Sequence, residues 1–383
     1  MRFPEFKGEW DKYRISDILE FFPTNSLSWD QLEYGTDNIY NLHYGLIHKG
    51  LPTQIEVYKC SLPNIKEDFI PKNYTLCENG DIAFADASED TNDVGKVVEF
   101  LNCENNYIVC GLHTIHGRDK KNLTIKGFKG YAFSSKVFRQ QIRRLAQGTK
   151  IYSISQKNFN DIFIGIPSKE EQIKIATLSR LLDKRITTQN KIIEDLKLLK
   201  STIRHQIFSK LEKSNFETKQ VNDILDYEQP TGYIVDSTDY CNDSSLTPVL
   251  TANKAFILGY SNEKNGIYDK GNCIIFDDFT MDIKYVDFPF KVKSSAIKIL
   301  KPKHEINLKF IFEYLSFLNF KSNDHKRHYI SEVESIQISI PEFGLQSHIA
   351  SLFFAIDKKI TIELSCQNLL FSQKQYLLNS LFV

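Results

Sequence analysis

Apolar residues recur at alternating steps of four and three along two long stretches of the chain, and the two stretches are copies of each other. The first runs from Ile166-Pro167 to Phe208, and the second runs from Ile340-Pro341 to Phe382. Matching positions are separated by a constant 174 residues, without a gap. Because an Ile-Pro step favours extended backbone just before a helix, each copy predicts one long helix that starts after its proline.

The spacing within each copy is typical of a coiled-coil seam, with seven of ten selected positions apolar. Two of the polar exceptions in each copy fall at equivalent places, Gln189 with Glu363 and Lys200 with Lys374. Polar seam residues set register, so we expect the two helices to pair with each other as an antiparallel coiled coil. The alternative is that each helix packs separately on its own globular domain. The residues expected to pair the helices are Ile175, Leu182, Ile186, Ile193, Leu196, Ile203, Ile207, Ile349, Phe353, Ile356, Ile360, Leu370, Leu377 and Leu381.

Two globular segments precede the helices, and they resemble each other weakly. Each opens with an amphipathic stretch that ends in Asp-Ile-Leu, at residues 17–19 and 223–225. Alternating apolar runs predict many short strands, and shorter helices are expected at Ser134–Gln147 and Leu308–Asn319. We therefore expect an α+β fold in which mixed sheets are flanked by helices. The predicted boundaries are 1–165 and 216–340 for the globular domains, and 166–215 and 341–383 for the helical regions.

Length, composition and charge limit the kind of protein that the chain can be. With 383 residues, 42% apolar and 25% charged, the chain is long enough for two or three folded domains. It shows no apolar run long enough to cross a bilayer and no signal-peptide core, so we expect a cytoplasmic protein. The net charge is zero, but residues 118–150 hold 10 Lys/Arg against one acidic residue, whereas residues 1–117 hold 9 against 19. A basic block therefore follows an acidic segment.

The seven cysteines are scattered and never form a C-x-x-C pair. This spacing predicts neither a disulfide framework nor a zinc site, so no metal is expected.

At this point the order of elements resembles a known family. Globular segment, helix, globular segment and helix, with Ile-Pro and then Glu-Gln-x-x-Ile-Ala opening the first helix, closely resembles the specificity subunits of type I restriction-modification systems. The first copy has the whole phrase at residues 166–176, whereas the second has Leu345 in place of the Glu. The globular segments resemble target-recognition domains at Gly80–Ser88, Pro248–Lys254 and His325–Ser331, and the likeness covers essentially the full chain.

The resemblance implies a non-catalytic subunit that reads a two-part, asymmetric site in double-stranded DNA. Its implied partners are two adenine-N6 methyltransferase subunits and the restriction subunits that supply motor and nuclease. No cofactor is expected in this chain, because S-adenosylmethionine would belong to the methyltransferase subunit.

DNA contacts are expected from basic, amide and aromatic side chains, since Lys and Arg contact phosphates while Arg, Asn and Gln can read base edges. In the first domain the candidates are His113, Arg118, Lys120, Lys121, Lys126, Lys129, Tyr131, Arg139, Arg143 and Arg144. In the second domain they are Asn253, Lys254, Thr280, Asp282, Lys284, Lys291, Lys293, Lys326, Arg327, His328 and Tyr329. The alternative for each residue is that it has no role in DNA binding and is a solvated surface charge or, for His113, a structural histidine.

Two further functions remain open on the sequence. Asp278 with Asp282-Ile283-Lys284 is similar to the Asp and Asp-x-Lys of metal-dependent nucleases, although the spacing is too tight for the usual strand pair. A coiled-coil scaffold for protein partners alone is the other. The sequence has no glycine-rich phosphate loop and no methyltransferase phrase, so catalysis is expected to come from elsewhere.

Overall fold

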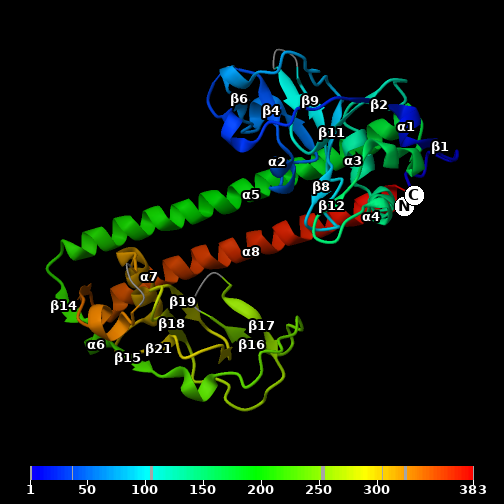
Figure 1. Ribbon diagram of the computed structural model, residues 1–383. Helices are drawn as coiled ribbons and strands as arrows, with labels where there is room; N and C mark the ends of the chain where they lie inside the picture. Colours follow the sequence, from blue (N-terminus) through cyan, green and yellow to red (C-terminus); the bar gives the residue numbers. More distant parts are fainter. Residues whose placement is uncertain are drawn as a thin grey trace. The chain divides into compact units, whose positions relative to one another are not determined.

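The computed structural model describes residues 2–36, 38–103, 107–251, 255–303, 305–322 and 326–382. Contacts divide the chain into two compact units. The first is Met1–Gln189 with Cys366–Val383, and the second is Asn190–Ser365. Each unit combines one globular segment with part of each of two long helices (Figure 1).

The long helices are α5, Lys169–Glu212, and α8, Phe343–Leu381. Both begin two residues after the proline of an Ile-Pro step, as the sequence predicts. Within the first unit Lys374 Nζ lies 2.6 Å from Asp183 Oδ1, and within the second Lys200 Nζ lies 2.7 Å from Asp357 Oδ1. A later residue of α5 therefore contacts an earlier residue of α8, so the two helices run antiparallel.

Each of the fourteen residues of the predicted seam is buried or half-buried. Leu182, Ile186 and Leu370 form a small cluster of their own between the helices. The outer seam residues also belong to the globular cores, where Ile175 packs in the core of the first unit and Phe353 in that of the second. Helix pairing and packing on a globular domain are therefore both present, at different points along each helix.

The first unit contains two mixed sheets, since each includes one parallel strand pair, β5 with β9 and β4 with β10. Their strand orders are β2-β11-β7-β9-β5 and β10-β4-β6-β3. The elements of this unit are β1 (Asp11–Arg14), α1 (Ile15–Ile18), β2 (Leu19–Phe22), β3 (Leu32–Glu33), β4 (Tyr40–Leu42), α2 (Tyr44–His48), β5 (Gln54–Glu56), β6 (Asn64–Ile65), β7 (Ile82–Ala85), β8 (Ala87–Ser88), β9 (Val97–Leu101), β10 (Ile108–Cys110), β11 (Thr114–Asp119), α3 (Lys129–Ser134), α4 (Lys136–Leu145), β12 (Tyr152–Ser153) and β13 (Phe163–Ile166).

The second unit has a four-stranded sheet, β15-β21-β18-β19, and a three-stranded sheet, β17-β16-β20. Its helix α7 matches the helix expected at Leu308–Asn319, and Asn319 ends it in the left-handed conformation. The elements are β14 (Glu217–Gln220), α6 (Val221–Ile224), β15 (Leu225–Glu228), β16 (Thr247–Leu250), β17 (Ile257–Ser261), β18 (Cys273–Asp277), β19 (Ile283–Val286), β20 (Lys291–Val292), β21 (Ile297–Pro302), α7 (Leu308–Leu318) and β22 (Gln337–Ile340).

The two globular segments repeat the same plan. In each, the Asp-Ile-Leu phrase ends a four-residue helix, α1 or α6, and starts the strand that follows it. That strand pairs antiparallel with a long strand, β2 with β11 and β15 with β21, and the long strand pairs next with a fully buried one, β7 or β18. The strand before the long helix also returns to the first strand of its segment, β13 to β1 and β22 to β14. The internal repeat therefore extends from the helices to the sheets.

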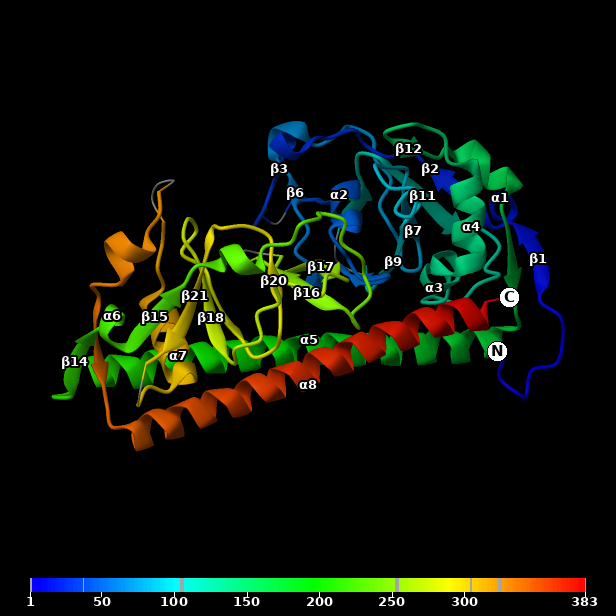
Figure 2. The same cartoon turned by 90° about the horizontal axis from the view of Figure 1, so that it is seen from below.

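The end of α8 closes onto the N-terminal segment within the first unit (Figure 2). The ring of Trp10 packs edge-on against Phe382 with centroids 6.1 Å apart. Leu378, Leu381 and Phe382 belong to the same core as Ile175 of α5. Across the described residues, no helix is both long and apolar enough to span a membrane.

Candidate nucleic-acid interface

A glutamine of the repeated phrase fastens each long helix to its globular segment. Gln172 accepts a hydrogen bond from the backbone N–H of Ile125 and donates to the carbonyls of Leu123 and Pro167. Gln346 does the same in the second unit, accepting from Asn307 and donating to Glu305 and Pro341. Both glutamines are 1% exposed, so their bonds are sheltered from water. The phrase thus fixes the domain surface relative to the start of its helix.

The two copies of the phrase differ at the residue before this glutamine. Glu171 is buried, accepts two hydrogen bonds from Arg2 and one from Trp10, and so binds the N-terminal segment. Leu345 occupies the equivalent place and packs against the core of the second unit. The carboxylate is therefore present in the copy that has a basic partner for it.

The basic block of the first unit is in part solvent-facing. Lys120, Lys121, Lys126, Arg143 and Arg144 are exposed, as predicted for residues that contact phosphates. Arg143 donates to Asn92 Oδ1, and half-buried Arg139 donates to the Asn92 carbonyl. Burial and the neighbouring Arg143 lower the pKa of Arg139 to about 10, so it remains charged at neutral pH.

Three members of the block have other roles, which corrects the prediction. Lys129 and Tyr131 are buried in α3, where Lys129 Nζ lies 3.5 Å from Glu99 and the Tyr131 hydroxyl donates to Asp183. Neither presents a donor to DNA. Arg118 donates twice to Asp81 and pairs with Glu78 at 2.6 Å, so its charge is balanced within the domain.

His113 occupies a left-handed turn with φ of 54° and its ring is half-exposed. Its Nδ1 lies 3.0 Å from Asp86 Oδ1, directly after the buried strand β7. Burial raises the pKa of Asp86, although the contact with His113 opposes that shift. This pair joins two strand ends and leaves one edge of the imidazole open to solvent.

The second unit exposes a smaller set of the predicted residues. Thr280, Asp282, Lys293, Lys326 and Arg327 are exposed, and Lys284 is half-buried. Lys291 is buried and ion-paired to Glu263 at 2.7 Å, and His328 and Tyr329 are buried, so the structure corrects these three. Asn253 and Lys254 lie outside the described residues.

Asp278 has a structural role, because it holds the segment at His328 and Tyr329 by hydrogen bonds. Its carboxylate accepts a hydrogen bond from the backbone N–H of Tyr329, and its carbonyl accepts one from His328. The side chain is buried, with Lys298 Nζ at 3.8 Å. In the part of the chain that the structure describes, neither Asp278 nor Asp282 belongs to a group of three metal-binding side chains. This geometry argues against the nuclease alternative.

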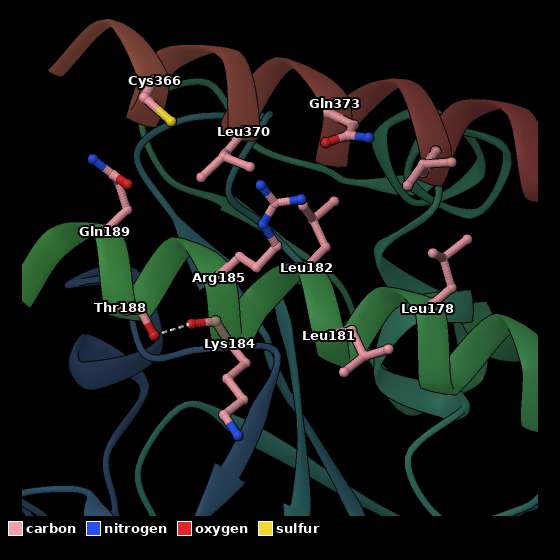
Figure 3. A pocket seen from close by; sticks show the side chains of 11 residues that line it. Leu178, Leu181, Leu182, Lys184, Arg185, Thr188, Gln189, Cys366, Leu370 and Gln373 are labelled. Carbon is pink, nitrogen blue, oxygen red and sulfur yellow. Dashed lines mark hydrogen bonds between the residues drawn. The ribbon is translucent and has the colours of Figure 1, made fainter. Parts of the chain in front are cut away.

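A groove of about 570 Å³ opens along the helix pair in the first unit (Figure 3). Leu182 of α5 and Leu370 of α8 lie on facing sides of the groove, with Arg185 beside them, and Leu178 also lines it. Buried Gln189 bounds the groove, at the polar position that interrupts the predicted seam. The groove is thus a loosely packed stretch of the seam.

Comparisons with known proteins agree with these features. A family model described as the type I restriction modification DNA specificity domain matches residues 213–369. The EcoR124I/EcoR124II type I specificity subunit of Escherichia coli is 40% identical over 182 residues, which are 43% of this chain. That match spans 44% of the length of the Escherichia coli subunit. A putative type I restriction enzyme MjaX specificity subunit of Methanocaldococcus jannaschii is 23% identical over 399 residues, covering 94% of this chain and 89% of that protein.

Solved structures share the fold. The S subunit of a type I restriction-modification system from M. genitalium has a TM-score of 0.61 at 18% identity, covering 100% of this chain and 99% of that one. A chain from a structure of complex assembly and conformational transition of the type I R-M system has a TM-score of 0.58 at 12% identity, covering 98% and 97%.

The family match places a type I restriction modification DNA specificity domain at residues 213–369, and the solved structures share the fold of the chain. The chain is similar to type I restriction-modification specificity subunits, in agreement with the resemblance stated from the sequence. Its named relatives are specificity subunits, in agreement with the expectation of a non-catalytic chain.

Proposed function

We propose that this chain reads a two-part asymmetric site in double-stranded DNA, one half with each globular unit. The observation that carries the proposal is the duplication. Both units have a buried strand at the same topological position, β7 or β18, and the Asp directly after that strand contacts His113 or Arg327. Two recognition units of one plan but different surface residues suit two different half-sites. The exposed lysines and arginines of each unit supply phosphate contacts, which position a protein on DNA without reading its sequence.

The long helices are proposed to set the unread gap between the half-sites. Helix α5 is continuous over 44 residues, which at about 1.5 Å per residue is about 66 Å. A helix of this length exceeds what packing on one globular domain needs, and its antiparallel partner stiffens it. We therefore expect the gap to follow helix length.

The same helices are proposed to bind two adenine-N6 methyltransferase subunits, to which the restriction subunits add. Large apolar side chains stay exposed on α5 and α8, among them Leu198 at 67% and Leu369 at 71%. Exposed apolar side chains on otherwise polar helix faces are typical of protein interaction sites. The methyltransferase would bring S-adenosylmethionine and the chemistry, and this chain would choose the adenines.

The test is to express the chain with its neighbouring methyltransferase gene in a host without DNA methylation, then map N6-methyladenine by single-molecule sequencing. The proposal predicts one bipartite motif with a modified adenine in each half. An intact complex that methylates no motif would overturn it and favour a protein scaffold.

A further inference from the structure

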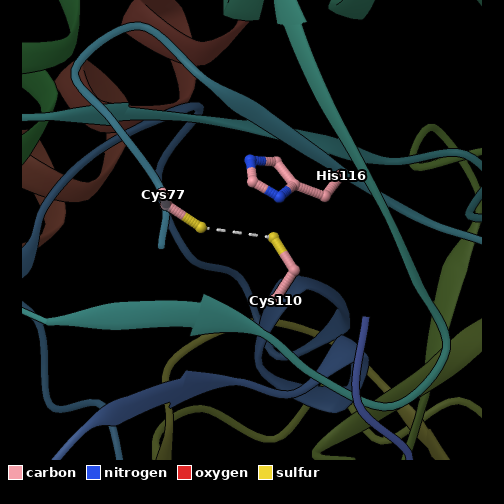
Figure 4. Close-up of side chains that lie close together, drawn as sticks. All are labelled: Cys77, Cys110 and His116. Atoms are coloured by element: carbon pink, nitrogen blue, oxygen red, sulfur yellow. Dashed lines mark hydrogen bonds between the residues drawn. The ribbon is translucent and has the colours of Figure 1, made fainter. Parts of the chain in front are cut away.

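Three side chains of the kinds that bind metals meet in the first unit (Figure 4). Cys77 precedes β7, Cys110 ends β10 and His116 lies in β11. All three are buried, and the two sulfurs and one ring nitrogen lie within 4.8 Å of one another. Cys77 and Cys110 are 33 residues apart, which is why no local cysteine spacing reveals the cluster.

The imidazole of His116 is oriented for a ligand. Its Nε2 lies 2.7 Å from Asp81 Oδ2, and the ring is 0% exposed. Its Nδ1 is buried and has no hydrogen-bond partner in the described residues, and Figure 4 shows a ring nitrogen turned toward the sulfurs. When a carboxylate accepts from Nε2–H, the Nδ1 lone pair is left free to bind a metal, as in carboxylate–histidine–zinc arrangements.

The sulfurs are spaced for a shared metal rather than for a disulfide. Cys77 Sγ and Cys110 Sγ lie 3.5 Å apart. A tetrahedral ion with metal–sulfur bonds of about 2.3 Å would hold two thiolates about 3.8 Å apart, a movement of a few tenths of an ångström. A disulfide requires about 2.05 Å, so the sulfurs would have to close by about 1.5 Å.

We infer that Cys77, Cys110 and His116 form a zinc site that joins the two sheets of the first unit. Cys110 belongs to the sheet β10-β4-β6-β3, and His116 belongs to β2-β11-β7-β9-β5. Three protein ligands leave the fourth position of Zn²⁺ to one water molecule.

The charges of the assembly balance. Zn²⁺ neutralises two thiolates, and Arg118, which donates twice to Asp81, neutralises the carboxylate that orients His116. A buried site with no net charge avoids the cost of an unpaired ion in a low-dielectric interior. Cys77 and Cys110 share a buried apolar cluster with Leu42 and Ile108, which shields the thiolates from bulk solvent.

The experiment uses the reduced full-length chain, stripped with a chelator and then dialysed against Zn²⁺. We expect one tightly bound zinc per chain, a higher Tm with zinc, and visible absorption typical of tetrahedral thiolate coordination when Co²⁺ replaces zinc. Cys77→Ser and Cys110→Ser should lose all three signals, and Asp81→Asn should weaken zinc binding about 10–100-fold. Cys241→Ser, an exposed cysteine of the second unit, and Cys273→Ser, a buried one, are the matched controls.

Because the zinc content of the unaltered chain needs no variant, a folding defect in Cys110→Ser leaves the test intact. Substoichiometric zinc in the unaltered chain, zinc retained by a folded Cys77→Ser variant, or a Cys77–Cys110 disulfide in peptide maps would each overturn the inference.

Discussion

Gln172 and Gln346 each satisfy three backbone groups at the point where a globular segment meets its long helix. We predict that Gln172→Ala lowers the free energy of unfolding by about 1–3 kcal/mol, because truncation leaves buried backbone groups unpaired. Urea unfolding of the full chain measures this. Gln206→Ala, at an exposed position of α5, is the control and should change stability little. Equal effects of the two substitutions would contradict the assignment.

Lys121 and Lys126 are exposed in the loop that follows β11. We predict that Lys121→Ala and Lys126→Ala each weaken DNA binding for all sequences alike and reduce the slope of log affinity against log salt by about 1. Anisotropy titrations of the complex with the methyltransferase, on specific and random duplexes over a series of salt concentrations, measure both quantities.

Two controls separate phosphate contact from general loss of charge. Lys72→Ala removes an exposed lysine from the acidic segment of the same unit and should leave the slope unchanged. Lys129→Met removes the buried lysine paired with Glu99, so it should affect stability more than the salt slope. A slope that falls equally in all variants would argue against a localised DNA surface.

Helices α5, α7 and α8 are joined by a charge cluster in the second unit. Lys200 contacts Asp357 at 2.7 Å and Glu313 at 3.0 Å, and Lys309 contacts the same two carboxylates at 2.6 and 2.9 Å. Burial alone would raise the pKa of Asp357, but hydrogen bonds from Lys200 and Lys309 more than offset it, so the net pKa is lowered.

The lowered pKa fixes the sign of a pH effect. Asp357 contributes stability above its unfolded pKa of about 3.9, and that contribution is lost as the pH falls toward its lower folded pKa. We predict that Asp357→Asn reduces the free energy of unfolding at neutral pH and flattens its decline below about pH 5. Denaturant unfolding across this range measures it. Asp195→Asn, in an exposed pair with Lys191, should leave the profile unchanged, and a profile that Asp357→Asn does not flatten would refute the role of the cluster.

The sequence predicts best the elements in which an apolar repeat continues over many residues. Helices α5 and α8 start and end within a few residues of the expected bounds, because a heptad seam over about forty residues outweighs any single position. The helix expected at Ser134–Gln147 is shorter: α4 covers Lys136–Leu145, with Ser135 capping it, and α3 occupies the residues before it. Short elements depend on caps and distant contacts that a local pattern does not contain.

For the candidate DNA surface, the sequence predicts the residue types but does not show which of these side chains are exposed. Lys129 and Lys291 look like any surface lysine in the sequence, but Glu99 and Glu263 bind them in the interior, 30 and 28 residues away. The backbone N–H of Tyr329 donates to the buried carboxylate of Asp278, which lies 51 residues earlier in the sequence. The Cys77, Cys110 and His116 cluster escaped prediction for the same reason, since strand pairing brings it together.

At the level of the whole chain, the two units repeat one plan, and both long helices contribute residues to each unit. We propose that the globular units read bases while the helices set the distance between the half-sites. The most direct measurement is a methylation map of a variant with one extra heptad inserted in α5 after Gln189 and another in α8 before Cys366.

Seven residues add about 10.5 Å, close to three base pairs of duplex at about 3.4 Å each, and a heptad nearly preserves the face of each helix. We predict that both half-sites remain as in the unaltered chain while the gap between them lengthens by about three base pairs. Methylation that persists with the original gap, or with altered half-sites, would contradict it.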